Sequence, residues 1–93
     1  MIIGIIQFQL RMADSHSLKD KRMVLKSIKD RLRQRFNIAV AEIGDQDLWQ
    51  SSLLGAAAIG NDKRYVNGLL TQVENWIERN GNVELVSSQM ELL

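Results

Sequence analysis

Residues 17–36, SLKDKRMVLKSIKDRLRQRF, constrain the fold more than any other stretch of the chain. Apolar side chains recur there every three to four residues, which predicts a helix with one buried face. The buried face is expected to hold Val24, Leu25, Ile28, Leu32 and Phe36. Ser17 precedes this run and Asp20 follows it three residues later, so we expect a capping box at the start of the helix.

The same helix carries a row of cations beside its apolar face. Four of them follow one another at helical spacing, and we call them the basic ridge: Arg22, Lys26, Lys29 and Arg33. Lys19 and Lys21 stand near the helix start, where unpaired backbone amides favour anions. Residues 19–35 hold eight bases and two acids, hence +6, while the remainder holds four bases and nine acids, hence −5. One cationic helix therefore belongs to an otherwise acidic chain.

The segments around this helix have the patterns of strands and of a second helix. Residues 2–13 are predicted to form a long strand, because apolar and polar side chains alternate from Ile6 onward. Further strands are predicted over 37–44, 51–59 and 83–92. The second helix is expected to begin after a cap at Asn61 or Asp62 and to end with a left-handed cap at Asn80-Gly81.

The third strand has the lowest strand propensity, because its sequence SSLLGAAAI is rich in alanine and glycine. A helix is the alternative there, but Gly55 and Gly60 disfavour a stable one, and a hairpin with the preceding strand is preferred. Small side chains in this strand would let a helix approach the sheet closely.

The order strand, helix, strand, strand, helix, strand predicts a fold. Two crossovers and one hairpin give the α+β, ferredoxin-like split βαββαβ arrangement, a four-stranded antiparallel sheet with two helices on one face. We expect residues 1–93 to form a single domain, since the chain shows no repeat and no linker.

Several motifs of this chain are similar to those of the YlxP-like family, a small bacterial domain family of unknown function. The resemblance spans nearly the whole chain and is most specific at 17–22 (SLKDKR), 36–37 (FN), 41–42 (AE) and 47–50 (DLWQ). It implies a ferredoxin-like fold, a cytoplasmic protein, and a gene that often neighbours those of translation initiation and ribosome maturation factors. The family supplies no agreed catalytic residues to carry over.

The residue types that support catalysis or metal binding are sparse. His16 is the single histidine and cysteine is absent, so neither a metal site nor a cofactor is expected. No glycine-rich phosphate loop is present. The carboxylates Glu42, Asp45 and Asp47 cluster after the second strand and are expected to be solvated. We therefore expect a protein that is not an enzyme, with an enzymatic role kept as a minor alternative.

The leading functional expectation is an accessory module that binds RNA or a ribosomal component. Its expected contacts are Lys19, Lys21, Arg22, Lys26, Lys29 and Arg33. From the first to the last residue the basic ridge spans about 16 Å, a length that could follow a phosphate backbone. Solvation or pairing of these cations within the protein remains the alternative. An aromatic content of 5% argues against recognition by base stacking.

The second functional expectation is a self-associating or protein-interaction domain. Alternation along the first strand sends Ile3 and Ile5 to the face of the sheet opposite the helices, which predicts an apolar surface there. A homodimer through this face would cover it. A bulge near Gly4 would instead return Ile3 to the core. Trp49, in the polar connection 45–50, either folds back over the sheet edge or contacts a partner. The chain has no apolar run long enough to span a membrane, so the cytoplasm is the expected location.

Overall fold

Six elements of secondary structure lie within residues 1–80 and 82–93, the residues that the computed structural model describes. They are β1 (Ile2–Arg11), α1 (Leu18–Arg35), β2 (Ala39–Gly44), β3 (Ser51–Gly60), α2 (Lys63–Asn80) and β4 (Glu84–Leu92). Each predicted element is present, including the alanine-rich third strand, and the observed bounds differ from the predicted ones by no more than about two residues.

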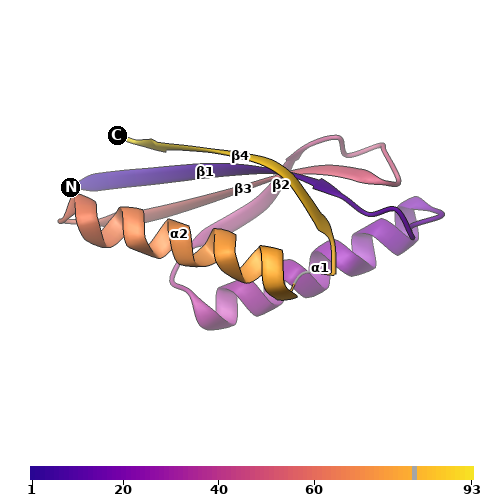
Figure 1. Cartoon of the computed structure of the whole chain (residues 1–93), viewed down its shortest axis with the longest axis horizontal. Coiled ribbons are helices and arrows are strands. Elements are labelled where there is room, and N and C mark those ends of the chain that lie inside the picture. Colours follow the sequence, from indigo (N-terminus) through magenta and orange to yellow (C-terminus); the bar gives the residue numbers. More distant parts are fainter. Residues whose placement is uncertain (81) are drawn as a thin grey trace.

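The four strands form one antiparallel sheet in the order β2-β3-β1-β4. Each helix connects two strands that have another strand between them, and Figure 1 shows both helices on the same side of the sheet. This is the predicted ferredoxin-like βαββαβ fold. The pairing of β1 with β3 runs without a break from Ile2 opposite Gly60 to Arg11 opposite Ser51, so the bulge considered near Gly4 is absent.

The ends of the helices follow the expected capping chemistry with one difference. The Ser17 hydroxyl accepts a hydrogen bond from the Asp20 amide at 3.1 Å, as predicted. The Asp20 carboxylate, however, accepts from the amide of His16 rather than from that of Ser17. Asp62 accepts from the amide of Arg64 at the start of α2. The left-handed cap expected at Gly81 lies outside the described residues.

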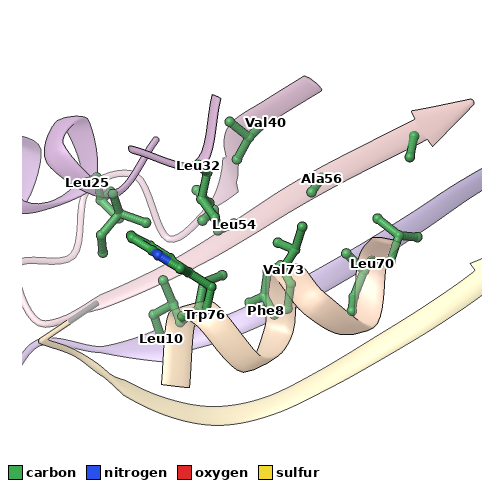
Figure 2. Close-up of a cluster of buried hydrophobic side chains, with 14 of the residues drawn as sticks. Phe8, Leu10, Leu25, Leu32, Val40, Leu54, Ala56, Leu70, Val73 and Trp76 are labelled. Atoms are coloured by element: carbon green, nitrogen blue, oxygen red, sulfur yellow. The ribbon is translucent and has the colours of Figure 1, made fainter. Parts of the chain in front are cut away.

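The core lies between the sheet and the two helices. Leu25, Ile28 and Leu32 are buried on α1, which confirms the predicted face of that helix. Val66, Leu70, Val73, Trp76 and Ile77 are the corresponding buried residues of α2. Figure 2 shows the Trp76 indole reaching from α2 towards Leu25 and Leu32, so this ring fills the space between the helices.

Small residues let α2 pack closely on the sheet. Ala56 and Ala58 of β3 are buried on the helix side, as the composition of that strand predicted. At Gly4 of β1 the approach is closer still, because a Cβ atom there would overlap the side chains of Val66 and Leu70. No helix among the described residues is long and apolar enough to cross a membrane.

We predict that Leu25→Ala lowers the free energy of unfolding by about 2–5 kcal/mol, because it leaves a cavity in a fully packed core. Urea titration measures this loss. The matched control is Met23→Ala on the exposed surface of α1, where a change within about 0.5 kcal/mol is expected. Equal effects of the two substitutions would contradict the assigned face of the helix.

Candidate functional site

The basic ridge lies on the surface of α1, on the flank nearer to strand β2. Arg22 and Lys26 are exposed, Lys29 is half-buried, and the Arg33 side chain is half-exposed. Lys19, in the first turn of the helix, is also exposed. Five of the six predicted contact residues are therefore accessible to an anionic ligand.

Part of the ridge is engaged within the protein. The ammonium of Lys26 and the guanidinium of Arg33 flank Asp30 at 2.9 and 3.7 Å. The hydrogen bond from Lys26, with weaker attraction from nearby cations, holds the pKa of the Asp30 carboxyl below its ordinary value. Arg33 also donates to the carbonyl oxygen of Val40 in β2 at 2.9 Å. Both alternatives considered for these cations, solvation and internal pairing, are thus present.

The opposite flank of α1 uses its arginine to hold α2. Arg31 lies over the ring of Trp76, with 4.9 Å between its guanidinium carbon and the ring centre. It also donates to the carbonyl oxygen of Asn80 at 3.0 Å. This cation joins the two helices and belongs to the packing between them.

Lys21 is not a surface contact, and the prediction that it contacts nucleic acid is wrong. Its side chain is fully buried, and its ammonium lies 2.9 Å from the Glu42 carboxylate. It also donates to the carbonyl oxygens of Asp45 and Ser51 at 2.6 and 3.0 Å. The physical reason is helical spacing. Lys21 lies four residues before Leu25 on the same buried face of α1, so its side chain points towards the sheet.

Lys21 is one member of a polar network at the end of the sheet where β2 meets β3. Ser52 donates its hydroxyl hydrogen to Glu42 at 2.8 Å, while Gln9 and Ser51 donate to Asp45 at 2.8 and 2.7 Å. Asp45 has a left-handed backbone, with φ of 59°. Glu42 and Asp45 are therefore held in place rather than solvated, which corrects the expectation for this acidic segment.

Hydrogen bonds from Gln9 and Ser51, with a smaller contribution from the charge of Lys21, hold the pKa of the Asp45 carboxyl below its ordinary value. The shift marks a carboxylate that is stabilised in its charged form. The polar network therefore suits a structural role, in which it holds α1 and the β2–β3 connection together. Within the described residues, no group of three or more His, Cys, Asp or Glu side chains is placed to hold a metal ion.

The connection between β2 and β3 is anchored at both ends. Its first residue, Asp45, belongs to the network, and the side chain of Gln50 donates to the carbonyl oxygens of Ala13 and Ser15, both at 3.1 Å. Between these anchors Leu48 and Trp49 remain 52% and 54% exposed. Together with Val86 of β4 they bound a cleft of about 740 Å³, whose lining also includes Gln9 and Arg11.

The face of the sheet opposite the helices, which we call the open face, is largely apolar. Ile3 and Ile5 lie on it, as alternation along β1 predicted, opposite Ile59 and Ala57 of β3. Its further apolar members are Ala39, Ala41, Ile43 and Leu53. Ile43 and Ile59 are 48% and 64% exposed, so the surface is accessible to a partner.

Comparison with known proteins places the chain in a family. The model of the family described as "Protein of unknown function (DUF503)" matches residues 3–90. The chain belongs to this family. A relative from Bacillus subtilis (strain 168), "Uncharacterized protein YlxP", is 33% identical over 90 residues, which cover 97% of this chain and 98% of the relative. The resemblance to the YlxP-like family inferred from the sequence motifs is confirmed.

Two solved structures share the fold of this DUF503 chain. The de novo designed protein Foldit4 is 13% identical with a TM-score of 0.53, over 99% of this chain and 94% of the designed one. LarC2, the C-terminal domain of a cyclometallase involved in the synthesis of the NPN cofactor of lactate racemase, is 13% identical with a TM-score of 0.50. That match covers 100% of this chain and 55% of the LarC2 chain. At these identities the likeness concerns the fold alone.

We predict that Lys21→Met lowers the free energy of unfolding by about 3–5 kcal/mol, because it leaves the Glu42 carboxylate without its buried partner. The double variant Lys21→Met/Glu42→Met should lose substantially less, since it removes both charges. Urea titration at one protein concentration compares them. A double variant as unstable as the single one would contradict a buried charge pair.

We further predict that Gln9→Ala raises the pKa of Asp45 towards its ordinary value, because Gln9 donates one of the two side-chain hydrogen bonds that stabilise that carboxylate in its charged form. Carboxyl-carbon NMR titration measures this shift. Since the folded pKa lies below the unfolded one, the hydrogen bonds stabilise the fold at neutral pH. Their contribution is lost as the pH falls below about 4. Gln7→Ala on the same strand is the control, and an unchanged Asp45 titration in Gln9→Ala would refute the assignment.

Proposed function

We propose that this DUF503 domain is a non-enzymatic accessory module that binds RNA or a ribosomal component through the accessible cations of α1. The supporting observation is that Lys19, Arg22 and Lys26 are exposed and that the half-buried Lys29 lies on the same side of the helix. Between Lys19 and Lys29 the side chains span about 15 Å of helix, a length that suits contacts to several phosphates of one strand.

Contact through the phosphate backbone fits this surface better than recognition of bases. Phe8 is fully buried and Phe36 is half-buried beside the core, so neither offers a ring for stacking. Trp49 is exposed, but it stands beside the open face of the sheet, on the side away from the helices. The proposed binding is therefore electrostatic, tolerant of sequence and sensitive to salt.

Arg33 plays a smaller part in this proposal than the sequence suggested, because its guanidinium already donates to Val40 and lies near Asp30. Lys21 plays none. The proposed location is the cytoplasm, in keeping with the resemblance to the YlxP-like family and with the absence of cysteine from the chain.

A second candidate is a protein-interaction domain that associates through the open face. The observation in its favour is the exposure of Ile43 and Ile59 on a surface that also holds Ile3 and Ile5. Contiguous apolar surfaces of this kind usually mark sites of protein contact. The two candidates use opposite sides of the molecule and are compatible with each other.

We predict that reversing Arg22, Lys26 and Lys29 to Glu abolishes the binding of single-stranded RNA and leaves the fold intact. In the parent protein, the logarithm of the affinity should fall steeply with the logarithm of the salt concentration. The slope should be about −0.7 for each phosphate contact. Fluorescence anisotropy across a salt series measures the affinity and slope, and circular dichroism verifies the fold.

The matched control reverses Lys63, Arg64 and Arg79, three exposed cations of α2, and so makes the same change in net charge elsewhere. This control should keep most of the affinity. Equal losses in the two triple variants would show that only net charge matters. Parent-like binding by the α1 variant would overturn the proposed site.

A further inference from the structure

The open face is apolar along β2 and β3, while β1 and β4 carry polar groups, Gln7 and Gln89, midway along their length. At one end Ile3 lies opposite Ile59, and in the middle Gln7 lies opposite Gly55. Leu48, Trp49 and Val86 gather at the other end, around the cleft described above. A partner that covers the whole face must therefore present apolar groups at both of its own ends.

We propose that the partner is a second copy of this chain, packed face to face with its strands reversed. The two-fold axis then lies between the two sheets, at right angles to the strands, at the level of Gln7 and Gly55. This inference names the occupant of the surface in the protein-interaction candidate. Reversal places the Trp49 end of each copy over the Ile3–Ile59 end of the other. Each copy thus supplies what the other lacks.

The size of the open face fits a dimer interface. Strands of ten residues at about 3.3 Å per residue, in a sheet four strands wide at about 4.8 Å spacing, give a footprint of roughly 600 Å². The side chains that project from the sheet, and the loop with Leu48 and Trp49, enlarge the contact area. Stable interfaces bury roughly 600–1,000 Å² on each partner, so this face alone is sufficient.

The charges on this face lie towards its two ends and are compatible with the reversed arrangement. The open-face charges of the strands lie on β1 and β4: Arg11, Glu84 and Glu91. Glu91 lies opposite Ile5 near one end, while Arg11 stands near the other. Neither Arg11 nor Glu91 takes part in a salt bridge among the described residues. Reversal places Glu91 of each copy over the end of the other that holds both Arg11 and Glu84, which lie opposite each other in the sheet, so Glu91 finds an opposite charge there.

The loop that carries Trp49 is fixed in position by hydrogen bonds on both sides of the tryptophan. Asp45 and Gln50, on either side of Leu48 and Trp49, are both fixed by hydrogen bonds to other segments. A large aromatic side chain on an anchored loop loses little conformational freedom on binding, a property of residues that dominate interface energies. The basic ridge stays exposed on the outer surface of each copy, so dimerisation and RNA binding can succeed or fail separately.

Light scattering at micromolar concentration should give twice the chain mass of 10.6 kDa for the parent protein. Ile5→Glu and Ile59→Glu should each give the monomer mass, because they bury charge in the interface. Ile59 is already 64% exposed, so its replacement does not threaten the fold. Met23→Glu, at an exposed apolar position of α1, is the control and should remain dimeric. A monomeric parent, or a dimer that persists in both interface variants, overturns the proposal.

The arrangement itself is tested with cysteines, since the natural chain has none. Leu48→Cys and Ile59→Cys chains are mixed and treated with a short bis-maleimide. Reversed packing predicts cross-links between the two different variants and none between two Ile59→Cys chains. Cross-linking of Ile59→Cys to itself, or no cross-link in a dimeric mixture, overturns the reversed arrangement.

Discussion

The buried ammonium group of Lys21 is the constraint on which this end of the molecule depends. A charge removed from water must find strong partners, and Lys21 finds the Glu42 carboxylate together with the carbonyl oxygens of Asp45 and Ser51. These groups come from both sides of the β2–β3 connection. Lys21 therefore fixes the position of the β2–β3 connection relative to α1. That connection begins at Asp45, whose backbone is left-handed.

This anchoring separates the polar and apolar sides of the connection. The polar groups of Asp45 and Gln50 turn inward to satisfy neighbouring segments, and Leu48 and Trp49 are left facing solvent. The domain then has two distinct outer surfaces, a cationic one on α1 and an apolar one on the open face. An antiparallel sheet covered on one side usually has a polar outer face, so the isoleucines at positions 3, 5, 43 and 59 are a departure that calls for a partner.

The fold and the outward direction of Ile3 and Ile5 could be predicted because both follow from periodicity within single segments. Even the alanine-rich β3 was assigned, since glycines disfavoured the helical alternative. The burial of Lys21 could also be predicted in part, because Lys21 lies four residues before Leu25 on the predicted buried face. The partners of Lys21 could not be predicted, because the register that brings Glu42 and Asp45 beneath α1 is set by the pairing of strands far apart in the sequence. Sequence spacing alone also could not tell whether Trp49 packs inward or remains exposed.

The cationic character of residues 19–35 is smaller at the surface than the sequence total of +6 implies, because neighbouring elements use several of these charges. Lys21 is neutralised by Glu42, Arg31 lies against Trp76 between the helices, and Arg33 reaches the edge of β2. In each case a guanidinium or ammonium satisfies an acceptor or a ring that the fold would otherwise leave without a partner. Of the cations that remain for an anionic ligand, Lys19, Arg22 and Lys26 are exposed in the first half of α1, Lys29 follows them partly buried, and Arg35 is exposed in the last turn. Any binding through this helix should therefore depend on Lys19, Arg22, Lys26 and Lys29 more than on Arg31 and Arg33.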